Sequence, residues 1–251
     1  MIRRASRISL GAGALGLAAL LALTSLSRPL PPGTTGPEAE TLARRLVEAV
    51  DGEAWQRTGA VRWTFAGRQH HLWDRRRNWA RVRWGDDAVL LDLDTRRGLA
   101  WRGGRPVAES EAGPLVERAW KHWVNDAFWL NPAVKVFDPG VERRLVTEGG
   151  APALLVTYST GGATLGDSYL WLPGPDGLPR TWLMWVSIIP LGGLSATWDG
   201  WQTLATGARV ATRHRILFYT LKLDEVAGAA SLADLEPGDD PFAALAAYLG
   251  G

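Results

Sequence analysis

Cysteine is absent from the chain of 251 residues. Its absence excludes disulfide bonds as a source of stability, and it excludes attachment of a lipid through an N-terminal cysteine. The glycine-rich loops that bind phosphate and the glycine fingerprint of dinucleotide-binding folds are missing as well. No segment repeats at a fixed period, which argues against a propeller or a solenoid. The stability of the fold must therefore come from burial of apolar side chains.

Tyrosine and phenylalanine are scarce, with 4 and 5 residues, whereas tryptophan is abundant, with 14. Hydrophobic residues make up 46% and charged residues 22%, which is ordinary for a globular protein and argues against a disordered or polytopic membrane chain. The length fits a single domain, since β-rich domains commonly reach about 200 residues. The tryptophans either anchor the core or line a binding surface.

The first 28 residues have the pattern of an export signal peptide or an N-terminal signal anchor. Arg3, Arg4 and Arg7 form a basic start, and the run from Ile8 to Ser27 carries no charge. This run approaches the length of a membrane-spanning helix, and Ser25-Leu26-Ser27 is a passable cleavage site, so both cleavage and retention stay open. A twin-arginine signal is a further alternative. We expect an exported protein, periplasmic or anchored in the membrane with its domain outside the cytoplasm.

The formal net charge of +2 is concentrated in the leader. Four of the 28 basic residues lie at positions 3, 4, 7 and 28, so the rest of the chain has 24 basic and 26 acidic residues. The rest of the chain is therefore slightly acidic, and electrostatic attraction to nucleic acid is not expected. The densest basic cluster, Arg75-Arg76-Arg77, falls between two strand patterns and is interpreted as a solvated turn.

Residues 29–37 are rich in proline and lack periodicity, which predicts a semi-extended spacer. Hydrophobic periodicity predicts one domain over residues 38–251. An apolar stripe predicts an amphipathic helix over Pro37–Val50 that stops at Gly52, and a second stripe predicts a helix over Glu109–Phe128. A short helix follows Asp240. Strands are expected over residues 61–65, 69–75, 78–84, 88–94, 98–102, 141–147, 153–160, 168–172, 180–189, 195–201 and 209–226, the last as two strands or one long bent strand.

Connections this short join only antiparallel neighbours. The predicted fold class is α+β, mainly β: one large curled antiparallel sheet, an incomplete barrel of about eleven strands, with helices over the concave side. The predicted strand segment Trp182–Ile189 is apolar on both faces, so both faces must be shielded. The inner face is then filled by side chains, closed by a lid, or occupied by an apolar ligand.

Three groups of residues are similar to the LolA/LolB superfamily of outer-membrane lipoprotein carriers and sorting factors. They are His71-Leu-Trp-Asp-Arg75 with Trp79 and Arg81, then Phe128–Pro132 with Asp138–Val141, and finally Asp167–Leu172 with Gly177-Leu-Pro179 and Trp182. By order of elements the resemblance covers roughly residues 38–226. It implies a half-barrel with a helical lid that holds acyl chains.

We therefore expect a non-enzymatic carrier or binding domain of the cell envelope, monomeric and without cofactor or metal. It would hold an acyl chain, a lipid or a lipid-anchored protein in an apolar concavity. The residues expected to line that concavity are Trp63, Phe65, Trp73, Trp84, Trp120, Trp123, Trp171, Trp182, Met184 and Trp185.

Two other functions stay open. Tryptophan rings could form a platform for glycans, or Ser168, within a Gly-Asp-Ser sequence like that of lipid esterases, could act with His214 as a hydrolase nucleophile and base. The esterase pattern is weak, because Ser168 opens a predicted strand and not a strand-to-helix turn. His122 and Asp126 have a spacing that suits one metal, but a third ligand is missing.

Overall fold

The computed structural model describes residues 27–160 and 165–250. The predicted signal or anchor lies outside the described residues up to position 26. Among the residues that the structure describes, no helix is both long enough and apolar enough to cross a membrane.

Thirteen antiparallel strands form one sheet, whose edge strands β6 and β7 do not pair to close a barrel. The prediction of a single, mainly β, antiparallel sheet with helices is confirmed, with thirteen strands in place of about eleven. In spatial order the strands are β6 (Arg105–Pro106), β5 (Gly98–Arg102), β4 (Asp87–Asp92), β3 (Trp79–Trp84), β2 (Gln69–Asp74), β1 (Ala60–Phe65), β15 (Tyr219–Ala229), β14 (Arg213–Ile216), β11 (Leu194–Thr197), β10 (Pro179–Trp185), β9 (Ser168–Pro173), β8 (Ala151–Tyr158) and β7 (Val141–Glu148). A separate pair joins β12 (Gln202–Thr203) to β13 (Arg209–Val210).

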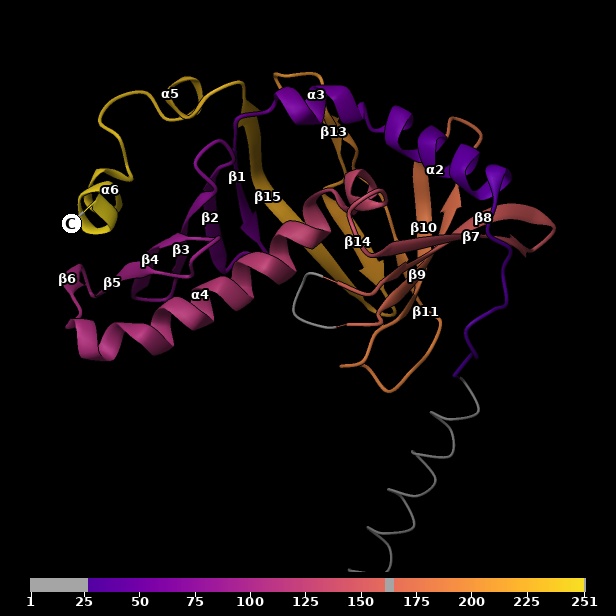
Figure 1. Cartoon of the computed structure of the whole chain (residues 1–251), viewed down its shortest axis with the longest axis horizontal. Coiled ribbons are helices and arrows are strands. Elements are labelled where there is room, and N and C mark those ends of the chain that lie inside the picture. The colour runs from indigo at the N-terminus through magenta and orange to yellow at the C-terminus, as the bar shows by residue number, and fades with distance from the viewer. Residues whose placement is uncertain (1–26, 161–164, 251) are drawn as a thin grey trace, which may run out of the picture.

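Three helices lie over one face of the sheet, which we call the inner face. They are α2 (Pro37–Ala49), α3 (Gly52–Arg57) and α4 (Glu109–Leu130), and α4 crosses the sheet diagonally (Figure 1). Gly52 begins α3 and does not stop the first helix, because Asp51 takes a left-handed conformation and its side chain accepts a hydrogen bond from Ala54 N.

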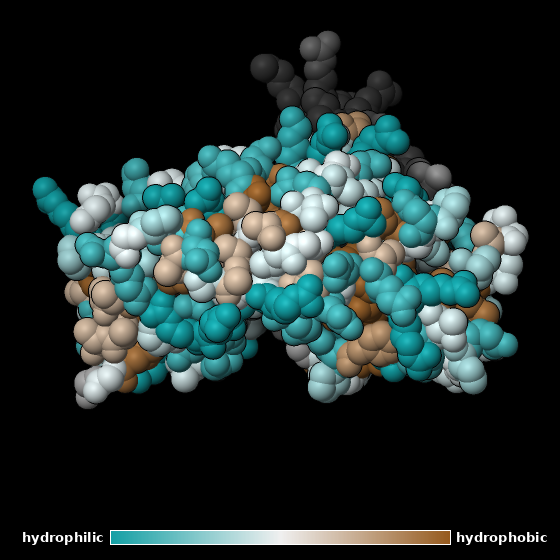
Figure 2. Space-filling view, turned by 90° about the horizontal axis from the view of Figure 1, so that it is seen from above, coloured by the Kyte–Doolittle hydropathy of each residue, from teal (hydrophilic) through white to brown (hydrophobic). Residues whose placement is uncertain are grey.

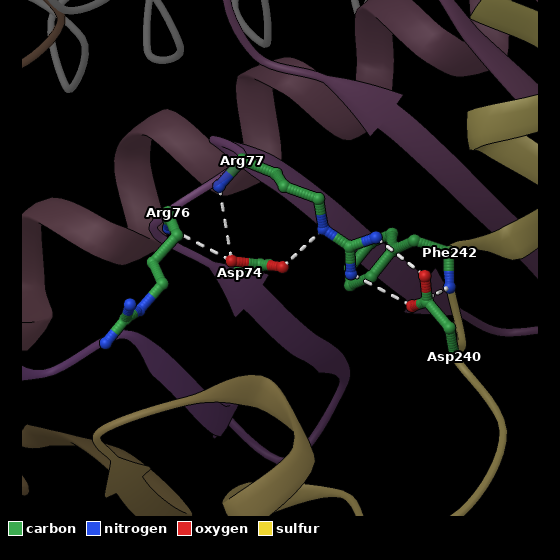
Figure 3. Close-up of polar contacts among 5 residues, drawn as sticks. All are labelled: Asp74, Arg76, Arg77, Asp240 and Phe242. Atoms are coloured by element: carbon green, nitrogen blue, oxygen red, sulfur yellow. Dashed lines mark hydrogen bonds and ion pairs between the residues drawn. The ribbon is translucent and has the colours of Figure 1, made fainter.

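The opposite, outer face is partly covered by the C-terminal segment, with α5 (Leu232–Leu235) and α6 (Ala243–Gly250). Phe242 and Leu245 pack there on Leu72 and Leu90. The arginine cluster holds this segment (Figure 3). Asp74 receives hydrogen bonds from the backbone of Arg76 and Arg77, and the Arg77 guanidinium bridges Asp74 to both oxygens of Asp240. The arginine cluster, predicted to be a solvated turn, therefore also binds the C-terminal segment to the sheet.

Several predicted boundaries are wrong. The segment expected as strand over residues 209–226 is divided into β13, β14 and β15, and the strand expected over residues 195–201 ends at Thr197. The strand expected over residues 180–189 ends at Trp185, and residues 186–193 form a loop, so Ile188 is 74% exposed. The second long helix extends beyond Phe128 to Leu130 and ends there, because Asn131 precedes Pro132 and a residue before proline disfavours the helical conformation.

The predicted spacer is held on the domain at its C-terminal end. Thr34 and Leu145 exchange two backbone hydrogen bonds of 3.0 and 2.7 Å, so this residue extends the sheet beside β7.

Candidate functional site

Aromatic side chains cover the inner face where β9, β10, β11 and β14 lie side by side. Strand alternation turns Tyr169, Trp171 and Trp182 to this face, and Trp198 follows β11. The ring centroid of Trp182 lies 4.9 Å from that of Trp171 and 4.8 Å from that of Trp198, both in edge-to-face arrangements. His214 from β14 completes this floor, at 4.3 Å from Trp198.

The last turn of α4 inserts two further rings over the floor. The Phe128 ring stacks at 5.8 Å on Trp182, and the Trp129 ring lies at 5.0 Å from Trp182 and 5.2 Å from His214. The residues of this aromatic cluster are Tyr158, Tyr169, Trp171, Trp182, Trp198 and His214 from the sheet side, with Phe128 and Trp129 from α4. We call this set the aromatic cluster.

Five polar atoms of the aromatic cluster are buried and have no hydrogen-bond partner within the described protein. They are the Nε1 atoms of Trp171, Trp182 and Trp198, the hydroxyl of Tyr158 and Nε2 of His214. A buried polar group without a partner costs about 1–3 kcal/mol, so native proteins leave few of them. The aromatic cluster holds five of the twelve such atoms in the described chain, and the other seven belong to Trp63, Gln69, His71, Arg75, Trp84, His122 and Trp123.

The environment of His214 fixes its protonation state. Its Nδ1 lies 3.1 Å from the carbonyl oxygen of Thr197, and burial lowers the pKa of the ring to about 4, against a smaller effect of that hydrogen bond. The ring is therefore neutral at pH 7. Because Nδ1 must carry the hydrogen to donate to a carbonyl, Nε2 is an acceptor that faces the aromatic cluster.

A buried histidine and aspartate join α4, near its C-terminal end, to the sheet. His71 Nε2 from β2 lies 2.7 Å from the Asp126 carboxylate, and the His71 ring stacks at 4.5 Å on Trp63. Burial lowers the pKa of His71, while the hydrogen bond and charge of Asp126 oppose the shift. This is the buried polar contact by which α4 is fixed over the inner face.

Asp126 thus has a different partner from the one its spacing suggested. It binds His71, whereas the His122 ring lies 5.2 Å from Trp84, and burial lowers the pKa of His122. No group of three or more potential ligands is arranged to hold a metal ion within residues 27–160 and 165–250.

Most residues predicted to line a concavity reach the inner face. Those packed on its apolar clusters are Trp63, Phe65, Trp73, Trp84, Trp120, Trp123, Trp171, Trp182 and Met184. Trp185 does not join them. It packs on the outer face with Leu183, and its Nε1 donates to the Arg28 carbonyl at 2.7 Å.

The aromatic cluster also contains rings that were not predicted as lining residues. Phe128 ends the predicted second helix and continues the stripe of Trp120 and Val124, whereas Trp129 lies beyond the predicted helix and off that stripe. That continuation was the available signal. Nothing in the local sequence pattern of His214 shows that it lies under α4.

Ser168 and His214 do not form a nucleophile and base pair. Ser168 lies opposite Trp185 in the ladder and shares its outer face, whereas His214 contacts Trp198 and Trp129 on the inner face. The Ser168 hydroxyl hydrogen-bonds the Thr157 hydroxyl at 2.8 Å. A sheet thickness therefore separates the two groups that a hydrolase would need in contact.

The sequence matches none of the protein-family models and none of the curated proteins with which it was compared.

A hollow of about 350 Å³ lies on the surface between α2, α3 and Phe137. Four of its seven lining residues, Arg44, Glu48, Asp51 and Glu53, are charged, and no residue of the aromatic cluster lines it.

Proposed function

We propose that the chain is a non-enzymatic binding domain of the cell envelope. It is exported, remains in the periplasm or anchored to the membrane, and holds an acyl chain, a lipid or the lipid anchor of another protein on its inner face. The observation that carries this proposal is the set of five unpartnered buried polar atoms within the aromatic cluster. Its half-barrel carrier character is also what the resemblance to the LolA/LolB superfamily implies.

The three indole donors among the five atoms define the polar part of the ligand. Indole Nε1 is a donor only, so Trp171, Trp182 and Trp198 together call for hydrogen-bond acceptors. The surrounding rings call for an apolar body. A molecule with a hydrocarbon chain and ester or carboxyl oxygens satisfies both demands, whereas a plain hydrocarbon would leave the indole donors without partners.

The ligand must occupy the space that the C-terminal turn of α4 fills in this structure. Phe128 and Trp129 are in ring contact with Trp182, so they occupy the position over the floor. The N-terminal half of α4 packs through Ala112, Leu115 and Ala119 on strands β3 to β5, and Asn131 follows the last turn with φ −159° and ψ 72°, outside the helical region. Binding in this proposal lifts only the last turn of α4, beyond the His71–Asp126 contact, while the preceding turns stay packed.

Photolabelling tests the proposal. The full-length protein is incubated with a fatty acid that carries a diazirine on its chain, irradiated, digested and analysed by mass spectrometry. Labels are expected on α4 residues 123–130 and on β9, β10 or β14, and excess unlabelled fatty acid should remove them. Labels spread over the outer face, or no competable label, would contradict the proposal.

Two matched variants sharpen this test. Trp182→Leu alters the floor on the inner face, and Trp101→Leu alters a half-buried tryptophan that packs with α6 on the outer face. Labelling should fall several-fold in the first variant and stay unchanged in the second. Equal labelling of both would show that the fatty acid binds elsewhere.

The alternative of glycan binding needs an exposed tryptophan ring on which a sugar can stack, and the described chain does not offer one. All 14 tryptophans lie in the described part of the chain, and each is buried or only partly accessible. Sugar stacking needs an open ring face, so the aromatic cluster supports an enclosed apolar ligand better.

A further inference from the structure

Five large apolar side chains are exposed at one end of the sheet. They are Leu165 at 68%, Ile188 at 74%, Leu217 at 66%, Phe218 at 98% and Tyr219 at 49% exposure. We call these five residues the apolar edge. Single exposed apolar residues are ordinary, but several at neighbouring loop tips indicate an interaction surface.

The strand register places these tips together. Ile216 pairs with Tyr219 at the β14–β15 hairpin, and Ala196 of β11 pairs with Ile216, so the loop that leads into β11 lies beside that hairpin. Trp185 pairs with Ser168 at the same end of β10 and β9. Ser187 N also donates to the Asp167 carboxylate at 2.9 Å, which ties the loop of Ile188 to the segment of Leu165.

The hairpin tip presents its apolar side chains at a conformational cost. Leu217 has a φ of 53°, in the left-handed region that glycine adopts without penalty. Phe218 beside it is almost fully exposed. A tight turn optimised for stability alone would have glycine and a polar residue at positions 217 and 218. The chain instead keeps two large apolar side chains there at a cost in turn stability.

The chain also enters the domain at this end. Gly192 N donates to the Ser27 hydroxyl at 2.9 Å, Arg28 N donates to Gly192 O at 2.9 Å, and Trp185 Nε1 donates to Arg28 O. Figure 1 shows the start of the described chain and the loop after β10 together at the lower end of the view. In the sequence, the uncharged run from Ile8 ends at Ser27, directly before this contact.

Cations flank the apolar edge on the outer face. Arg213 and Lys222 are paired directly across β14 and β15, and Arg215 follows on the same side. All three are exposed, and none makes an ion pair with a described residue. Two like charges placed opposite each other repel, so this arrangement favours an anionic partner.

The opposite end of the molecule has a different surface. Seen from above in Figure 2, hydrophilic residues predominate and hydrophobic ones form small scattered patches. Of the seven exposed large hydrophobic residues in the described chain, five form the apolar edge, and the other two are Leu30 and Phe137.

We infer that the apolar edge is a membrane-docking surface: Leu217, Phe218 and Ile188 insert among the headgroups of an anionic bilayer, at the same end of the domain as Ser27. The occupant is lipid because the segment of chain next to Ser27 has the composition of a bilayer-inserted segment. The inference does not depend on what the inner face holds.

The absence of cysteine makes a direct test possible. The full-length protein is made as Phe218→Cys or as Pro175→Cys, the latter in the exposed β9–β10 turn at the other end of these strands. Each is labelled with an environment-sensitive fluorophore and reconstituted into liposomes of phosphatidylglycerol and phosphatidylcholine that contain a nitroxide lipid. We expect the label at position 218 to be quenched at least about fivefold more than the label at position 175, since interfacial side chains reach the headgroup and acyl boundary.

Equal quenching at the two positions would overturn the inference. So would a label at position 218 that is shielded from water without quenching by the nitroxide lipid, because this identifies a second protein copy as the occupant. A third variant removes the edge without harming the turn. Leu217→Gly with Phe218→Ser suits the hairpin better, so it should fold normally and reduce the quenching of a label at position 188 several-fold. Unchanged quenching would contradict the role of the hairpin tip.

Discussion

Acidification should weaken the fold through His214. This ring is fully buried, its Nδ1 donates to Thr197 O, and its Nε2 faces Trp129 and Trp198. Burial lowers its pKa from 6.5 to about 4. As the pH falls, the unfolded chain therefore takes up a proton on His214 before the folded protein does, and the free energy of unfolding decreases.

The magnitude follows from the two pKa values. The stabilisation by neutral His214 is complete above pH 6.5 and is lost as the pH falls towards 4. A difference of this size corresponds to a loss of about 3 kcal/mol over the whole interval, and of about 2 kcal/mol by pH 5. A cation placed between two indole rings recovers part of this cost, so the measured loss should not exceed these figures.

Urea unfolding followed by tryptophan fluorescence at pH 7.5, 6.5, 5.5 and 5 measures the effect. His214→Gln removes the titration, and since His71 and His122 also have lowered pKa values, the difference between wild type and variant isolates His214. The variant is expected to be less stable at pH 7.5 but to lose less on acidification. Parallel pH profiles for the two proteins would refute the reasoning.

Three further substitutions test other parts of the fold. Asp126→Asn should lower the pKa of His71 further, which an NMR titration measures, because it removes the carboxylate that opposes the shift. It should also cost about 1–3 kcal/mol of stability in chemical denaturation, since a buried charged acceptor is replaced. An unchanged titration of His71 would contradict the contact. Trp182→Ala should cost about 3–5 kcal/mol through the cavity it leaves, and a Tm close to that of the wild type would show that the aromatic cluster collapses around it. Arg77→Ala should cost about 1–3 kcal/mol, because the pair with Asp240 is partly exposed but the buried Asp74 carboxylate also loses its guanidinium partner. It should also speed proteolysis after residue 230, and protection equal to wild type would show that Phe242 alone holds the C-terminal segment.

The N-terminal half of the sheet was predictable because its signals are local. Alternating apolar residues and short polar turns between residues 61 and 102 require antiparallel neighbours, and β1 to β5 form the predicted meander. The aromatic cluster was less predictable. Apolar residues occur on both faces of β10, so the sequence pattern carries no information on which face Trp185 occupies.

Composition and periodicity alone determined that the fold would be a mainly β, disulfide-free domain with two helical interruptions and an excess of indole rings to bury. Tertiary structure decided which rings meet. His71 and Asp126 are 55 positions apart, and Trp129 and His214 are farther apart still, so only the packing of α4 across the sheet brings them together. Contacts across such separations follow from chain topology, and local propensity does not encode them.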